Sequence, residues 1–251
     1  MSSGLAFYLA AVPAVILLGL SKGGFSGLGA LAVPVMALAI SPVRAAAIML
    51  PLLIVGDWIS VWAFRRDFSP RNLAILIPSS IIGVGVGWLL AARVSEDAVR
   101  LAVGAISIAF VLYMLIRDRL NVAPVARPGV PGGVLWGSLA GFTSFVSHAG
   151  APPFQVYVMP QKLEPRVFAG TSTIVFAAIN LLKVPPYFFL GQFDRANLLA
   201  AGGLMPVAIV SALGGVWLVR RVSADRFYAI VLALTFLIGA KLVWDATEAL
   251  L

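Results

Sequence analysis

The sequence predicts an all-α polytopic membrane protein built from two inverted repeats. Hydrophobic residues make up 61% and charged residues 11% of the 251 positions, and the mean hydropathy is +1.02. Soluble domains are about 45–50% apolar and about 25% charged, so a soluble globular enzyme is excluded. The apolar runs are continuous rather than alternating, which excludes the short strands of a membrane β-barrel. Each long run therefore predicts a transmembrane helix.

Six runs are long enough to cross the bilayer as ordinary helices, because each is close to the roughly 20 residues that the hydrocarbon core requires. They cover residues 45–64, 72–92, 98–116, 167–190, 196–219 and 227–244. Two further apolar regions, residues 5–40 and 134–159, are interrupted by small and polar residues at 21–27 and 143–153. We expect each interrupted region to form a broken helical hairpin that returns to the side it entered from.

The distribution of basic residues favours hairpins over single crossings. If each broken region crossed once, eight Lys and Arg residues would face seven, which gives no orientation. With hairpins, eleven basic residues share one side and four share the other, as the positive-inside rule requires. The arms 5–20 and 28–40 are also short, at roughly 24 and 20 Å, for a core about 30 Å thick. This topology places both termini on the outer side of the membrane and the residues 119–131 linker in the cytoplasm.

The two halves of the chain, residues 1–118 and 132–251, resemble each other. At a separation of 123 positions, Gly27 aligns with Gly150 and Asp57 with Asn180. Later, the eleven residues from Gly87 and from Gly215 share six identities. Each half has an odd number of crossings, so the halves are expected to be inverted, as in many secondary transporters. The alternative is chance similarity between apolar helices.

The two breaks fall at equivalent places in the repeat and predict a binding site. Non-helical backbone at membrane depth must be buried in protein or line a wet cavity. Helices that restart near Leu28 and Phe154 would direct their N-terminal N–H groups at an anion. The alternative is that the small residues only permit tight helix packing. The expected substrate-binding residues are Ser21, Lys22, Gly23, Gly24, Ser26, Gly27, Ser147, His148 and Gly150.

Three polar residues inside predicted spans are candidates for coupling or for supporting the site: Asp57, Asn180 and Lys183. Asp57 takes up a proton or pairs with Lys22 in this interpretation. The alternatives are that Asp57 only accepts hydrogen bonds, that Lys22 snorkels to an interface and that His148 is structural. Because Pro185 and Pro186 follow it, Lys183 is expected toward the outer interface and ranks below the other two. The partners expected are a small anion, the lipid bilayer and H⁺ or Na⁺ as coupling ion.

Several functions are excluded or disfavoured. The chain has no cysteine, which removes thiolate chemistry and Cys metal sites. It has no P-loop, and we expect no cofactor, no metal and no nucleic acid. Gly24-Phe25-Ser26-Gly27 matches a G-x-S-G string of intramembrane serine proteases, but a protease would not require duplicated breaks. An anion channel remains the main alternative to a transporter, with a structural membrane subunit as another.

Three segments resemble the sulfite exporter TauE/SafE family, also called the toluene sulfonate uptake permease (TSUP) family. They are residues 19–29 followed by Pro34, residues 145–153, and residues 180–186. The resemblance covers nearly the whole chain. It implies a multi-pass transporter, not an enzyme, in the bacterial inner membrane that carries small sulfur-containing or organic anions such as sulfite or sulfonates. It does not identify the anion, the direction of transport or the oligomeric state.

Overall fold

Ten α-helices and one 3₁₀ turn make up the described part of the chain, which contains no strand. The computed structural model describes residues 2–23, 25–90, 96–120, 123–125 and 127–250. In the first half the helices are α1 Ser2–Ser21, α2 Ser26–Ala37, α3 Pro42–Ala63, α4 Pro70–Leu90 and α5 Glu96–Arg119. In the second half they are α6 Val130–Ser147, α7 Ala151–Val158 with the 3₁₀ turn Met159–Gln161, α8 Pro165–Phe189, α9 Arg195–Val219 and α10 Ala224–Leu250.

The expectation of an all-α protein with six long spans is confirmed. Helices α3, α4, α5, α8, α9 and α10 are each long and apolar enough to cross a membrane. Their ends differ from the expected ends by a few residues, the largest difference being the extension of α10 to Leu250. Both breaks are shorter than expected, because residues 143–147 continue α6 and Ser26 already begins α2.

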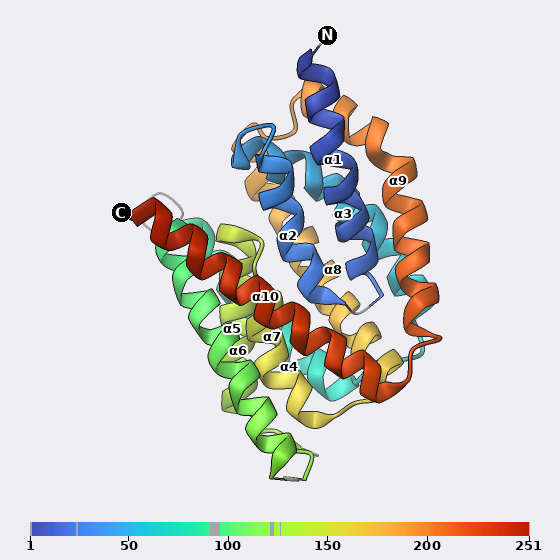
Figure 1. The fold of residues 1–251 in the computed structure, drawn as a ribbon, viewed down its shortest axis with the longest axis vertical. Helices are drawn as coiled ribbons and strands as arrows, with labels where there is room; N and C mark the ends of the chain where they lie inside the picture. The colour runs from blue at the N-terminus through green and yellow to red at the C-terminus, as the bar shows by residue number, and fades with distance from the viewer. Residues whose placement is uncertain (1, 24, 91–95, 121–122, 126, 251) are drawn as a thin grey trace.

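Helices α1 and α2 lie side by side and run in opposite directions (Figure 1). The first of these helices descends from the N-terminus to the middle of the molecule, and the second returns toward the same end (Figure 1). Both chain ends lie in the upper half of this view (Figure 1). The first broken region is therefore a hairpin whose tip is inside the molecule.

Hydrogen bonds between distant loops show which helix ends lie together. Arg44 Nε donates to Asn197 Oδ1 at 3.1 Å, so the start of α3 meets the start of α9. At the opposite end Lys162 Nζ donates to Asp118 Oδ1 at 2.8 Å, and Arg220 Nη2 donates to the carbonyl of Ala63 at 3.0 Å. Single crossings of the broken regions would separate all three pairs. The structure therefore agrees with the grouping of basic residues that hairpins predict.

The helices of the two halves make corresponding contacts when α1 to α5 are matched in chain order with α6 to α10. Helix α4 packs on α6, and the corresponding pair α9 and α1 is in contact as well. Helix α3 packs on α9, and α8 packs correspondingly on α4. Helix α10 packs on α2, and α5 packs correspondingly on α7. The pairs α3–α8, α5–α10 and α2–α7 join equivalent helices of the two halves. Equivalent helices thus have equivalent neighbours.

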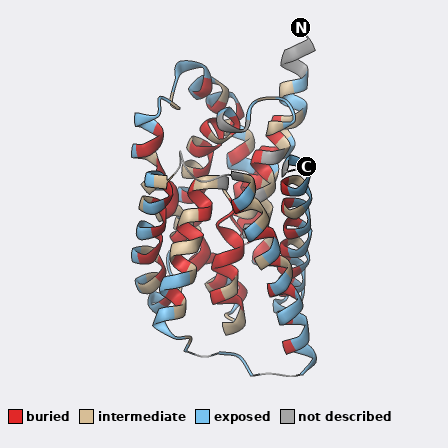
Figure 2. Ribbon diagram, turned by 90° about the vertical axis from the view of Figure 1, so that its left-hand side faces the viewer, coloured by how far each residue is buried: buried red, intermediate tan, exposed pale blue. Residues whose placement is uncertain are grey.

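Buried residues line the inner faces of the helices and exposed residues the outer faces (Figure 2). Many of the exposed side chains are large and apolar, among them Leu89, Trp62 and Phe189, which are 70–81% exposed. A soluble protein would bury such side chains, but in a bilayer they face lipid. The polar residues Lys22, Asp57, Asn180 and Lys183 show the reverse, since each is at most 6% exposed.

Candidate anion site between the hairpin tips

The tip of the first hairpin is held against α9 by glycines. The N–H groups of Lys22 and Gly23 donate to the carbonyls of Gly19 and Leu20 at 3.0 and 3.1 Å, which closes the end of α1. A Cβ atom on Gly23 would lie 2.0 Å from the carbonyl oxygen of Gly215. Only a glycine permits this approach between the backbones. The contact fixes Lys22, the next residue toward α1, inside the molecule.

The tip of the second hairpin turns at His148. This residue ends α6 in the left-handed conformation with φ of 54°. The N–H of Ala149 donates to the carbonyl of Thr143 at 3.2 Å, and the Thr143 hydroxyl donates to the carbonyl of Ala149 at 3.1 Å. Gly150 then leads into α7. The turn therefore satisfies its own backbone groups within a buried region.

The expectation that two helix N-termini direct their N–H groups at an anion is corrected for the second hairpin. Helix α7 starts at Ala151 rather than near Phe154, and Pro152 and Pro153 occupy its first turn. Proline has no N–H group, so this helix end offers few donors. In the first hairpin, the N–H of Leu28 is already bonded to the carbonyl of Phe25 at 2.9 Å. The first turn of α7 therefore offers fewer backbone donors than the sequence predicted.

An ion pair and an amide join the two halves at the centre of the site. Lys22 Nζ lies 2.5 Å from Asp57 Oδ1. Asn180 Nδ2 donates to the other oxygen, Asp57 Oδ2, at 2.8 Å. Lys22 is 6% exposed and Asp57 and Asn180 are each 3% exposed. The expected pairing of Asp57 with Lys22 is present, and the snorkelling alternative for Lys22 does not fit its burial.

Lys183 occupies a position that the sequence did not predict. It is fully buried, with 0% exposure, and its Nζ has no hydrogen-bond partner within the described residues. It lines the same cavity as Asp57 and Asn180, so the structure gives no reason to rank it below these two residues. An unpaired ammonium group in an apolar interior is unfavourable. A negatively charged ligand at Nζ would remove that penalty.

These groups surround one small cavity of about 60 Å³. A single water molecule requires roughly 10–15 Å³ on the same measure, so the space suits a small anion. Its lining comes from both hairpins and from α3 and α8. The polar residues lining it are Ser21, Lys22, Asp57, Ser144, His148, Ser172, Thr173, Asn180 and Lys183.

The structure brings together most of the expected site residues. Ser21, Lys22, His148 and Gly150 line the cavity together with Asp57, Asn180 and Lys183. Gly23 contacts α9 instead and supports the tip. Gly27 belongs to the first turn of α2. Gly24 lies outside the described residues, as do the side chains of Ser26 and Ser147.

Two cavity hydroxyls, on Ser172 and Thr173, were not anticipated. Thr173 Oγ1 donates to the backbone carbonyl of Lys22 at 3.4 Å, which links α8 to the first hairpin tip. His148 also has an unanticipated neighbour, since its Nε2 lies 2.9 Å from the hydroxyl of Tyr187. Hydroxyl residues are common inside apolar helices. The one available signal was their position, two turns before Asn180 on the same helix.

Comparison with known proteins identifies the family. A model of the sulfite exporter TauE/SafE family matches residues 11–242. The chain belongs to this family. Searches of curated proteins and of solved structures found no match. Membership in the TauE/SafE family makes the chain a membrane transporter rather than an enzyme, and it removes the serine protease alternative.

Proposed function

We propose that this protein is a secondary active transporter of small sulfur-containing or organic anions, such as sulfite and sulfonates. The anion binds in the cavity between the hairpin tips and contacts Lys183 directly. The unpartnered Nζ of Lys183, at 0% exposure, carries the proposal. A buried ammonium group that has no hydrogen-bond partner and lies beside a cavity is stabilised in its charged form by an anion. Membership in a sulfite exporter family supports the choice of anion.

We propose further that residues 1–118 and 132–251 are inverted repeats that rock around this cavity. The paired helix contacts support this arrangement, because equivalent helices have equivalent neighbours. The cavity lies where α3 of one half meets α8 of the other. Movement of one half relative to the other would therefore open it toward either side.

The proposed orientation places both termini in the periplasm of a bacterial inner membrane and the 119–131 linker in the cytoplasm. The predicted topology groups eleven basic residues on one side, and the bonds of Lys162 to Asp118 and of Arg220 to Ala63 support this grouping. The cytoplasmic side of membrane proteins carries such an excess. Transport is coupled to H⁺ or Na⁺ in this proposal, since the chain has no P-loop for ATP.

Counterflow in liposomes tests the proposed function. Vesicles containing the purified protein are loaded with unlabelled sulfite and diluted into a trace of radioactive sulfite. A carrier accumulates the label transiently and saturates with sulfite, and we expect this result. A current that rises linearly with anion concentration, without counterflow, would indicate an anion channel. Absence of any anion flux or binding would leave a structural membrane subunit.

A further inference from the structure

The cavity lining carries more positive than negative formal charges. Among the described lining residues, Lys22 and Lys183 carry formal positive charges and Asp57 carries a negative charge. His148 is the remaining titratable group, and an imidazole with an ordinary pKa of about 6.5 is mostly neutral at neutral pH. With both lysines protonated, the formal charge of the cavity lining is therefore one positive unit.

The hydrogen bonds assign that excess to one residue. Asp57 uses Oδ1 for Lys22 at 2.5 Å and Oδ2 for Asn180 at 2.8 Å. One carboxylate oxygen thus bonds to Lys22 and the other to Asn180. Lys183 is the cavity lysine whose Nζ has no hydrogen-bond partner within the described structure.

We propose that this cavity selects singly charged oxyanions over doubly charged ones, and that Asp57 sets this limit. The inference rests on the proposed function. A monoanion beside Lys183 makes the buried site neutral, whereas a dianion leaves one negative charge without a partner in a region of low dielectric constant. Sulfonates and hydrogensulfite are therefore ligands, and sulfate and thiosulfate are rejected.

The apolar part of the lining favours the same class of anion. Leu18, Val33, Met49, Leu53 and Phe176 complete the cavity wall. A carbon substituent, such as the methyl group of methanesulfonate, is accommodated by such a wall without loss of hydrogen bonds. A fourth charged oxygen in its place would be desolvated with no donor from these side chains.

Methanesulfonate and sulfate form a matched pair for the test, because both are small tetrahedral anions and they differ in charge. Calorimetric titration of the purified protein at about pH 7.5, where histidine is mostly neutral, gives both affinities. We expect the wild type to bind methanesulfonate at least roughly tenfold more tightly than sulfate, given the penalty for an unpaired charge at membrane depth.

Two variants test the formal charge of the cavity: the first raises it, and the second restores it. Asp57→Asn keeps the shape and raises the formal charge to two positive units, so the preference should reverse toward sulfate. The double variant Lys22→Met with Asp57→Asn returns the count to one, so the preference for methanesulfonate should return. A purely structural role for Asp57 would lower both affinities together and would not produce this reversal and recovery.

The results that overturn the inference are distinct from those that overturn the proposed function. Equal or tighter binding of sulfate by the wild type contradicts the charge limit, even if no variant folds. An unchanged preference in a folded Asp57→Asn protein contradicts the role of Asp57. Both results leave an anion transporter in place. If the wild type binds neither these anions nor sulfite, the proposed function fails together with the inference.

Discussion

Asp57 and Asn180 are hydrogen-bonded to each other at 2.8 Å although 123 residues separate them in the chain. The same separation relates the two halves of the sequence, so the bond joins equivalent positions on α3 and α8. One side chain is a carboxylate and the other an amide, which permits donation from Asn180. Two carboxylates here would repel each other. The two halves therefore differ at the centre of the site, where the first supplies a carboxylate and the second an amide.

Removal of Asp57 alone should destabilise the protein strongly. Asp57→Ala leaves Lys22 buried without its partner, which costs about 3–5 kcal/mol in the free energy of unfolding. The double variant Lys22→Met with Asp57→Leu removes both charges and should unfold close to the wild type. Tryptophan fluorescence during denaturation in detergent measures these differences.

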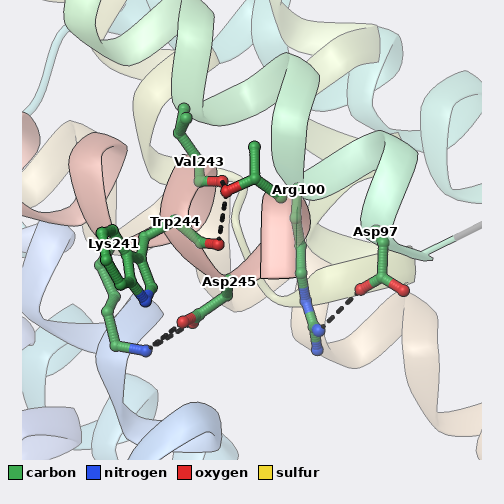
Figure 3. Close-up of polar contacts among 7 residues, drawn as sticks. Asp97, Arg100, Lys241, Val243, Trp244 and Asp245 are labelled. Carbon is green, nitrogen blue, oxygen red and sulfur yellow. Dashed lines mark hydrogen bonds and ion pairs between the residues drawn. The ribbon is translucent and has the colours of Figure 1, made fainter. Parts of the chain in front are cut away.

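A surface ion pair provides the control for this experiment. Lys241 and Asp245 are paired one turn apart on α10, and Asp97 and Arg100 are paired on α5 (Figure 3). Lys241 is 52% exposed at its side chain, so Lys241→Met should cost about 0–1 kcal/mol. If Asp57→Ala costs no more than Lys241→Met, the central ion pair is not desolvated as described.

The contact between Gly23 and α9 predicts a second sensitive position. Gly23→Ala places a methyl group where the Gly215 carbonyl oxygen lies, 2.0 Å from the new Cβ atom. The hairpin tip must move, and we expect lower thermal stability and weaker anion binding. Gly202→Ala, on the same helix α9, meets no atom within 4 Å. It should be neutral or stabilising by up to about 1 kcal/mol. Equal effects of the two substitutions would refute the close approach.

The left-handed conformation of His148 predicts the relative stabilities of variants at this position. Its φ of 54° suits glycine and asparagine but not a β-branched residue. His148→Val should therefore be less stable than His148→Gly by about 1–2 kcal/mol. Thermal unfolding of the two variants gives the comparison. A valine variant as stable as the glycine variant would show that the chain does not turn this way at residue 148.

The proposed orientation can be tested with single cysteines, because the chain has none of its own. Arg195 and Arg127 are both exposed. Arg195 begins α9, whose start meets the start of α3. Arg127 precedes Pro128, whose carbonyl accepts from Arg71 at the start of α4, beyond the other end of α3. In intact bacterial cells, a membrane-impermeant maleimide should label Arg195→Cys, and it should label Arg127→Cys after the inner membrane is permeabilised. The reverse pattern would invert the orientation.

Hydropathy was sufficient to predict the six long helices. Lipid offers no hydrogen-bond partner to backbone N–H and C=O groups, so each apolar run of sufficient length must be a helix. The broken regions were recognisable because glycine, proline and charge interrupt apolar runs at equivalent places. The exact break was not predictable, since Pro152 and Pro153 can begin a helix as well as interrupt one.

The site residues that could be predicted are polar or charged residues within apolar segments. Lys22, Asp57 and Asn180 drew attention by polarity and by the repeat, and they are bonded together. Lys183 was ranked below Asp57 and Asn180 because two prolines follow it, but it lines the same cavity. Ser172 and Thr173 were not anticipated, because hydroxyl groups in apolar helices usually bond to their own backbone. Their role depends on helix packing that no local pattern encodes.

Binding of methanesulfonate to the wild type and to Lys183→Met tests the central claim most directly. The Lys183→Met side chain retains much of the volume of lysine but has no charge, so the folded protein should lose at least roughly tenfold in affinity. Its unfolding temperature without ligand should not fall, because a buried unpaired charge has been removed. Lys241→Met should bind like the wild type. Unchanged affinity in a folded Lys183→Met protein would contradict the assignment of this cavity as the anion site.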